Sequence, residues 1–181
     1  MKKGLMIVNN KVEDIEALAT RDLLIRSGLN ITLATLESSK TITTSYGITM
    51  FVDRHINEIS ADDFDFLVLP GGSHVFDWID KEVGLTAMIN DFNSNNKLIA
   101  AICAAPLFLS KAGILTNSKF TAFPSVVEDI KGVYETNSKV VVLDNIITAR
   151  SAGVVFDFAF EIIKKVLGND KVKELKNSIV Y

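Results

Sequence analysis

Cysteine is almost absent from this chain, since one residue among 181 carries a thiol. A lone cysteine cannot form an internal disulfide, so the sequence fits a reducing compartment such as the cytoplasm and leaves its thiol free. Histidine is nearly as scarce, with two residues. Together these residues do not make up a clustered ligand set, and we expect no bound metal.

Long apolar runs are also missing. None reaches the length of a transmembrane helix, and the stretch from Met1 to Val8 is too short and too charged for a signal peptide. The charge is close to balanced, with 22 acidic and 19 basic residues and a formal net charge of −3. Because no basic cluster stands out, the sequence does not suggest binding to nucleic acid or to a membrane surface.

Apolar residues make up 48% of the chain, and 181 residues suffice for one sizeable core but not for two ordinary domains. We therefore expect a single domain over residues 1–181, in which apolar runs alternate with amphipathic segments. The expected strands are Gly4 to Val8, Ile31 to Leu36, Phe64 to Leu69, Leu98 to Ile102 and Lys119 to Ala122, with hairpins over Thr41 to Val52 and Val140 to Ala149. The expected helices are Glu13 to Ser27, Lys81 to Asn95, Pro106 to Lys111, Phe156 to Leu167 and Lys171 to Lys176. Val75 to Ile79 is expected as a short turn or helix, and Ser125 to Ile130 as one or two helical turns. This alternation predicts an α/β doubly wound sandwich, with a mostly parallel central sheet and helices on both faces.

The cysteine, Cys103, directly follows one of these buried strands. Pro106 suits the first turn of a helix, where its missing N–H costs nothing, so Cys103 is expected on a strand-to-helix turn. A thiol at the positive end of a helix dipole has a lowered pKa. From residue type alone, however, a lone cysteine in an apolar run is more often a small buried hydrophobe.

The chain's three prolines, Pro70, Pro106 and Pro124, all follow apolar runs. In a doubly wound sheet the carboxyl ends of the strands meet at one edge, which is where ligands bind. The loop at Glu13 to Glu16 and the turn at Arg150-Ser151 should open on the same edge. We therefore place the candidate site there.

Four segments resemble the ThiJ/PfpI superfamily, in its DJ-one branch. They are Leu69 to Gly72, Ala100 to Pro106, Glu13 to Glu16 and Thr148 to Gly153. The similarity covers essentially the whole chain, and the spacings together make a specific signal. The resemblance implies a flavodoxin-like sandwich, a homodimer and chemistry that needs no cofactor.

Matched position by position, the resemblance implies that Cys103 is the reactive thiol and Glu16 the acid beside it. It also implies that the N–H groups of Gly72 and Ala104 form an oxyanion pocket, to which the turn residue Gly71 also belongs. Arg150 either binds an anion near the pocket or pairs with a carboxylate, and the sequence does not separate these readings.

Two departures from the superfamily concern histidine. Its protease-like branches place a histidine directly after the cysteine, where this chain has Ala104. Other members carry one before the proline that matches Pro124, where this chain has Phe123 at the expected pocket rim. His74 is a second candidate for the rim, although a solvated surface position is the simpler reading, as it is for His55. Because a Cys-His dyad is missing, we do not expect peptidase activity.

An ionised carboxylate next to a sulfur opposes formation of the thiolate, so the pairing of Glu16 with Cys103 helps only if Glu16 holds its proton. We therefore expect a lowered pKa at Cys103 and a raised pKa at Glu16, in a pair that titrates together. The simpler alternative is that Glu16 is an exposed acid that complements its helix dipole, as Glu13 and Asp14 beside it would be.

Two functions follow. The resemblance implies a glyoxalase III or deglycase activity, in which Cys103 adds to methylglyoxal or a related reactive carbonyl, or to a glycated substrate, while Glu16 moves the proton. The alternative is a redox-sensing stress-response protein with chaperone-like activity. In that case Cys103 is oxidised, and because no second cysteine is present, the sulfenate cannot close to an internal disulfide.

Overall fold

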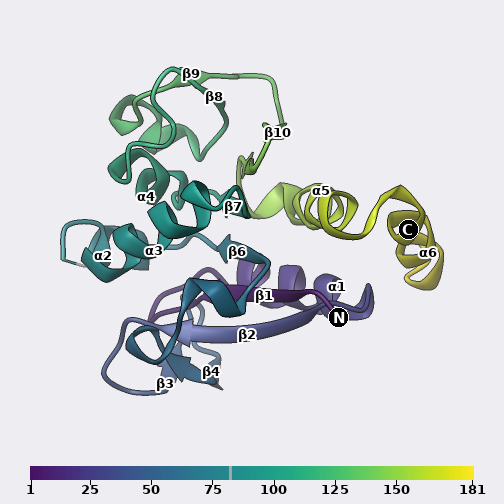
Figure 1. Cartoon of the computed structure of the whole chain (residues 1–181), viewed down its shortest axis with the longest axis horizontal. Coiled ribbons are helices and arrows are strands. Elements are labelled where there is room, and N and C mark those ends of the chain that lie inside the picture. The colour runs from purple at the N-terminus through teal and green to yellow at the C-terminus, as the bar shows by residue number, and fades with distance from the viewer. Residues whose placement is uncertain (82) are drawn as a thin grey trace.

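The computed structural model describes residues 1–81 and 83–181. Within these residues the main sheet has seven strands in the order β10-β11-β7-β6-β1-β2-β5 (Figure 1). Adjacent strands run parallel, except that β10 is antiparallel to β11. The strands are β1 Lys3–Ile7, β2 Asn30–Thr35, β5 Arg54–His55, β6 Phe66–Leu69, β7 Leu98–Ile102, β10 Val140–Val142 and β11 Ile146–Ala149.

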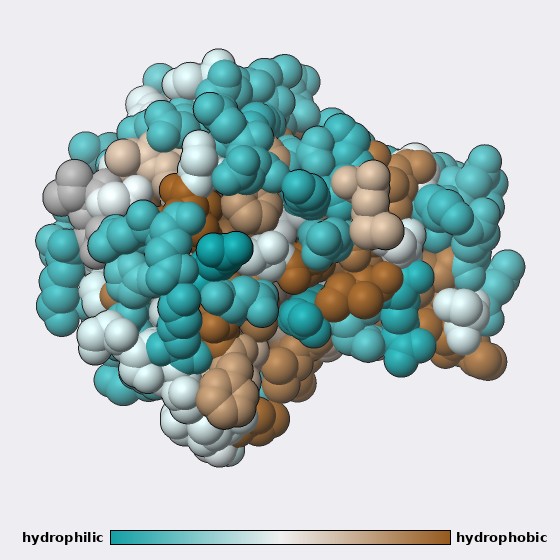
Figure 2. Space-filling model, turned by 60° about the horizontal axis from the view of Figure 1, so that its bottom comes forward, coloured by the Kyte–Doolittle hydropathy of each residue, from teal (hydrophilic) through white to brown (hydrophobic). Residues whose placement is uncertain are grey.

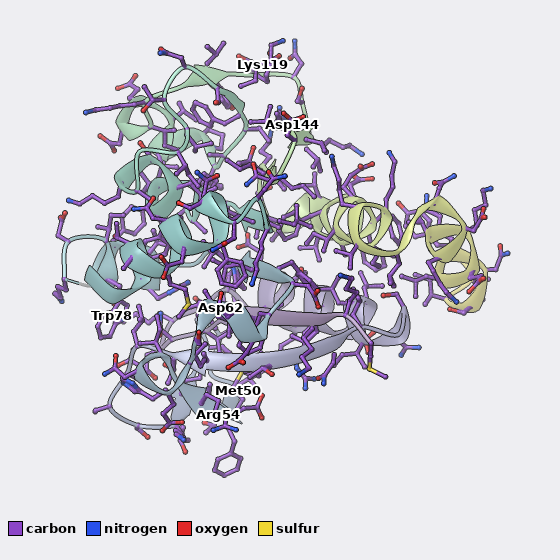
Figure 3. All side chains as sticks on the ribbon, in the orientation of Figure 1. Met50, Arg54, Asp62, Trp78, Lys119 and Asp144 are labelled. Atoms are coloured by element: carbon purple, nitrogen blue, oxygen red, sulfur yellow. The ribbon has the colours of Figure 1, made fainter. Side chains whose placement is uncertain are left out.

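Helices cover both faces of this sheet, which confirms the predicted fold class. In Figure 1, α2, α3 and α4 lie on one side of the sheet and α1, α5 and α6 on the other. The helices are α1 Thr20–Arg26, α2 His74–Trp78, α3 Val83–Ser94, α4 Pro106–Lys111, α5 Val155–Leu167 and α6 Asn169–Ser178, with a π-helical turn η1 at Ile15–Ala19 and 3₁₀ segments η2 Ile56–Glu58, η3 Ala61–Asp63, η4 Pro124–Asp129 and η5 Ala152–Val154. Trp78, at the end of α2, is labelled at the periphery in Figure 3.

The central strands are continuous apolar runs because both of their faces are buried. Along β6, Phe66 and Val68 belong to the core between the sheet and α1 and α5, where Phe158 of α5 also lies. Leu67 and Leu69 point to the opposite core, beneath α3 and α4. One short strand thus supplies side chains to two separate hydrophobic layers.

The order of the parallel strands creates a switch point beside β1. From β1 the chain moves to β2 on one side, and it later returns to place β6 on the other side. In such sheets ligands bind at the carboxyl ends of the strands that flank the switch point. The loops that follow β1, β6 and β7 meet there.

The first predicted helix, Glu13 to Ser27, is divided in two. Its first part is the π-helical turn η1, and α1 begins only at Thr20. A π turn holds one residue more than an α turn and shifts the side chains around the helix axis. Ile15 is therefore exposed, although the helical spacing placed it with the apolar residues of the buried face. Gly28, at a φ of +94°, ends the helix as expected.

The structure also differs from expectation near β8, Lys119–Phe120. This strand pairs with β9, Val133–Tyr134, in a separate two-stranded sheet. Pro124 therefore does not follow a strand of the main sheet, unlike Pro70. Strand β5 was not predicted because its two residues carry no apolar run. The predicted helix Lys81 to Asn95 is observed as α3 from Val83 onward, and the expectation for residue 82 lies outside the described residues.

The predicted hairpin near residue 45 is formed by β3, Thr41–Thr43, and β4, Thr49–Phe51. Met50, labelled in Figure 3, lies on β4. The hairpin exposes Tyr46 and Phe51, which are 81% and 83% accessible. The view in Figure 2 brings this end of the molecule forward and shows apolar side chains between the polar ones.

Among the helices that the structure describes, none combines the length and the apolar character needed to cross a lipid bilayer.

Candidate functional site

Cys103 lies on the predicted turn between a strand and a helix, in an unusual backbone conformation. Its φ is +64°, in the left-handed region that side chains other than glycine seldom occupy. Two hydrogen bonds hold this turn: Cys103 N–H donates to Ala149 O at 2.9 Å, and Phe123 N–H donates to Cys103 O at 2.8 Å. Such strained turns present a nucleophile at the top of a sheet. The thiol is free and partly buried.

Glu16 lies in η1 and is completely buried. Its Oε2 accepts the N–H of Gly71 at 2.8 Å, and its own N–H donates to Glu13 Oε2 at 2.8 Å. Oε1 is buried and has no hydrogen-bond partner of good geometry among the described residues. The alternative of an exposed acid that only complements a helix dipole is therefore wrong for Glu16.

Two glycines bring the acid and the thiol together. A Cβ at Gly71 would lie 2.7 Å from Cys103 Cβ and 2.7 Å from Glu16 Oε2. Gly72 has a φ of +107°, and a Cβ there would lie 2.5 Å from both Glu13 N and Lys11 O. The loops after β1, β6 and β7 can meet because Gly71 and Gly72, in the turn after β6, carry no side chains.

Burial raises the pKa of Glu16 to about 7, and the charge of Glu13 adds to this effect. The Cys103 side chain and the N–H groups of Gly71 and Ala152 act in the opposite direction. The raised pKa of Glu16 agrees with expectation. At pH 7 this carboxyl group is divided between its protonated and ionised forms.

The lowered pKa expected for Cys103 is wrong. Burial raises the pKa of its thiol, and the charge of Glu16 and a hydrogen bond to Glu16 raise it further. The N–H groups of Ala104 and Gly72 hydrogen-bond to the sulfur and lower the pKa, but they do not overcome these effects. The expectation considered the dipole of α4 and neglected the cost of removing a thiolate from water.

Once the pair has lost one proton, the remaining proton lies mainly on Cys103, because the pKa of Glu16 is the lower of the two. When it lies on the sulfur the charge is on Glu16, where the N–H of Gly71 stabilises it. When it lies on Glu16 the charge is on Cys103, where the N–H groups of Ala104 and Gly72 stabilise it. Transfer within the pair changes no net charge, so it avoids the desolvation cost of adding a charge to the site.

His74 does not lie on the surface or at the rim. It is 1% exposed, beneath the Pro70-Gly71-Gly72 turn. Its Nδ1 lies 3.1 Å from Asn9 Nδ2 and its Nε2 lies 3.1 Å from Pro70 O. Burial lowers its pKa to about 4. Sequence reasoning missed this position because α2 turns His74 inward, and no spacing signal predicts it.

Phe123 and Arg150 lie on either side of the cysteine turn. Phe123 bonds the Cys103 carbonyl through its N–H, while its side chain keeps 43% of its surface exposed. Arg150 follows β11 and donates from Nη2 to Thr136 O. The ion pairs found among the described residues do not include Arg150, so the structure does not show the carboxylate pairing that was one of the two readings left open. Its Nε is buried and has no hydrogen-bond partner among the residues that the structure describes.

Asp14 was also misjudged as an exposed acid. It is buried, and its carboxylate accepts Thr44 Oγ1–H at 2.7 Å and the Tyr46 N–H at 3.1 Å. These bonds join the segment that carries Glu16 to the β3–β4 hairpin. No cluster of three or more histidine, cysteine or acidic side chains able to hold a metal is found in the part of the chain that the structure describes.

The chain is similar to known proteins along most of its length. Residues 2–165 match the DJ-1/PfpI family. Protein dj-1beta of Drosophila melanogaster is 30% identical over 99% of this chain and 97% of its own length. A deglycase of Pyrococcus horikoshii is 29% identical over 90% of this chain and 98% of its own length.

Solved structures show the same relationship. The crystal structure of Drosophila melanogaster DJ-1beta matches with a TM-score of 0.93 at 29% identity, over 99% of this chain and 97% of that one. Toxoplasma gondii DJ-1, in an oxidized form, matches with a TM-score of 0.92 at 26% identity, over 100% of this chain and 99% of that one. The chain belongs to the DJ-1/PfpI family.

Proposed function

We propose that this protein is a cofactor-independent glyoxalase or deglycase that acts on methylglyoxal or related reactive carbonyls. The observation that carries this proposal is the buried carboxyl of Glu16 beside Cys103, since a Cβ at Gly71 would lie 2.7 Å from both Glu16 Oε2 and Cys103 Cβ. The N–H groups of Gly72 and Ala104 support it, because they lower the pKa of the thiol. A nucleophile, an acid/base and an oxyanion pocket are the parts that such chemistry needs. The Pyrococcus relative that is named a deglycase supports the substrate class.

The first step forms a bond between the sulfur of Cys103 and the aldehyde carbon of methylglyoxal. Glu16 takes the thiol proton as the sulfur attacks, and returns it to the carbonyl oxygen to give a hemithioacetal. The pKa of about 7 at Glu16 suits both transfers, because the group can hold or release a proton near neutral pH. The N–H groups of Gly72 and Ala104 stabilise the oxygen while it carries negative charge.

The second step moves a proton between neighbouring carbons. Glu16 removes the hydrogen of the former aldehyde carbon and delivers a proton to the adjacent carbon, which leaves a thioester of lactate on Cys103. Water then cleaves the carbon–sulfur bond, which releases lactate and restores the thiol. Atoms balance with one water consumed, and no redox partner or cofactor takes part.

The test is lactate formation from methylglyoxal by the pure protein without glutathione. The wild-type protein should form lactate, whereas Cys103→Ser and Glu16→Gln should each lose at least about 100-fold in rate, the typical contribution of a nucleophile or of general acid–base catalysis. Ser110→Ala is the matched control, because Ser110 lies on α4 away from the Cys103 turn. Equal rates in the wild type and in both site variants would reject the proposal.

A second candidate function is redox sensing through the same sulfur, with chaperone-like protection of other proteins. It is favoured by the N–H groups that point at Cys103, because they can also bind the oxygens of an oxidised sulfur, to which a protonated Glu16 can donate. The Toxoplasma relative, whose structure is of an oxidized form, supports it.

Mild peroxide treatment followed by intact-mass and peptide analysis tests this second function. The mass should rise by two oxygen atoms, both located on Cys103, and Cys103→Ser should not gain them. Oxidation confined to the four methionines, with Cys103 unchanged, would contradict it. Peptidase activity is not part of either proposal, because Ala104 and Phe123 stand where the superfamily's histidines lie.

A homodimer is the assembly that we propose for either function. The β3–β4 hairpin offers exposed Tyr46, Ile48 and Phe51 as an apolar surface that a second copy could cover. Because Asp14 joins this hairpin to the segment of Glu16, a partner that rests on the hairpin would also steady the site.

A further inference from the structure

One peptide group lies between His74 and Glu16. The carbonyl of Pro70 faces His74 Nε2 at 3.1 Å, and the N–H of Gly71, which belongs to the same amide, donates to Glu16 Oε2 at 2.8 Å. The imidazole and the carboxyl group therefore bond to opposite ends of a single planar unit. Neither function proposed above uses the imidazole.

The surrounding bonds fix the tautomer of His74. Asn9 Oδ1 accepts the N–H of Leu36 at 2.8 Å and Thr35 Oγ1–H at 3.0 Å. The other end of the Asn9 amide, Nδ2, therefore faces His74 Nδ1 and must donate to it. A carbonyl oxygen such as that of Pro70 can only accept, so the hydrogen of the ring lies on Nε2.

Burial keeps this imidazole neutral, because it lowers the pKa of His74 to about 4. The charged group that faces the ring is the Asp77 carboxylate, which Lys11 pairs at 2.9 Å. The ring of Phe108 lies 6.3 Å away and carries no charge. At neutral pH the ring thus acts as a fixed donor.

We infer that His74 and Asn9 are positioning residues, which act on Glu16 through the Pro70–Gly71 amide. The chain of bonds runs from Asn9 through the ring and the peptide group to the carboxyl. Donation to the carbonyl polarises the amide and strengthens its N–H as a donor to Glu16. It also fixes the plane of the peptide, and with it the direction of the N–H.

The consequence concerns where the shared proton lies. A strong N–H of Gly71 favours the ionised form of Glu16 and so keeps the proton on Cys103 until a substrate arrives. If the relay is weakened, Glu16 holds its proton to higher pH and the sulfur carries more of the charge. The other groups around Glu16, which are Glu13, Cys103 and the N–H of Ala152, are not touched by this change.

The test compares two substitutions of similar size by ¹³C NMR titration of the Glu16 carboxyl group. In His74→Gln the side-chain Nε2 can take the place of the ring Nε2 and still donate to Pro70 O. In His74→Leu no donor remains. We expect the titration midpoint of Glu16 to rise by about 0.5 pH unit in His74→Leu and to stay near the wild-type value in His74→Gln.

The rate of Cys103 alkylation at pH 7 gives a second readout, which should rise in His74→Leu only. Equal midpoints and equal alkylation rates in the two variants would overturn the inference. If His74→Leu does not fold, ¹⁵N NMR of the wild-type imidazole decides instead. Shifts of a neutral ring with hydrogen on Nε2 support the relay, and hydrogen on Nδ1 or a charged ring at pH 7 overturns it.

The inference deepens the proposed function, on which its catalytic meaning rests. Its test measures protonation and not turnover. A protein that makes no lactate could still show the shift in His74→Leu, and an active enzyme could fail to show it. The two proposals therefore fail separately.

Discussion

At the scale of single residues, the buried groups Glu16 and His74 have opposite effects on how the stability of the protein changes with pH. The pKa of Glu16 is raised from 4.5 to about 7 by folding, so the folded state binds more protons than the unfolded state in this range. The contribution of Glu16 is complete below pH 4.5 and is lost as the pH rises through 7. The pKa of His74 falls from 6.5 to about 4, so its contribution is complete above pH 6.5 and is lost as the pH falls through 4.

Between pH 4.5 and 6.5 the effects of the two groups on the free energy of unfolding should therefore nearly cancel in the wild-type protein. In His74→Gln the free energy of unfolding should fall by about 3 kcal/mol as the pH rises from 4.5 to 7. In Glu16→Gln it should rise by about 3 kcal/mol from pH 4 to 6.5. Urea denaturation at several pH values measures both slopes. Variants that follow the wild-type curve would show that these groups titrate alike in the folded and unfolded states.

How much of the candidate site could be predicted from the sequence also differs from residue to residue. Cys103, Glu16 and the Gly71-Gly72 turn were predicted correctly as neighbours, because motifs at strand ends of one sheet edge must converge. The pKa of the thiol was not, because desolvation depends on the packing of side chains from distant segments. His74 was misjudged for the same reason: its burial depends on Asn9 and on the turn above it.

At the scale of elements, the contact between the β3–β4 hairpin and η1 depends on Asp14. Replacing Asp14 with alanine removes the acceptor of Thr44 Oγ1–H and of the Tyr46 N–H. We expect Asp14→Ala to lower the free energy of unfolding by about 1–3 kcal/mol, because buried donors lose their partner. Activity should fall as well, since Glu16 lies two residues away on the same turn.

Chemical denaturation and the lactate assay measure these two effects. Asp14→Asn is the matched control, because its amide oxygen can still accept one of the two bonds and should recover part of the stability. An Asp14→Ala variant with the stability and activity of the wild type would mean that the hairpin does not hold the segment of Glu16 in place.

Most elements of the main sheet could be predicted because their buried strands are uninterrupted apolar runs. The elements that were missed are short or locally irregular. A two-residue strand such as β5 leaves no pattern, and β8 pairs with residues of β9 that lie 14 positions further along the chain. The π turn η1 could not be predicted, because the apolar residues around it keep the spacing of an α-helix.

At the scale of the whole molecule, the proposed homodimer can be tested by sedimentation. If the hairpin forms a dimer interface, Phe51→Asp should shift sedimentation from a dimer to a monomer, because the change places a charge on a side chain that is 83% exposed in the single chain. Val133→Asp, at an exposed apolar position on β9, is the control and should leave the sedimentation unchanged.

A wild-type protein that sediments as a monomer at micromolar concentration would contradict the proposed homodimer. A dimer that survives in Phe51→Asp would place the interface on another face. Family membership and fold class could both be predicted from the sequence, because their signals extend along the whole chain. The surface that a second copy would use is not encoded in such a pattern.

The bare turn at Gly72 also limits how the site can be redesigned. Because any side chain there would overlap the backbone at Lys11 and Glu13, position 72 is closed to substitutions that aim at a new substrate range. Phe123, whose ring is partly exposed while its N–H holds the cysteine turn, leaves its side chain open to change. Libraries that aim at bulkier aldehydes should therefore vary Phe123 and leave Gly72 unchanged.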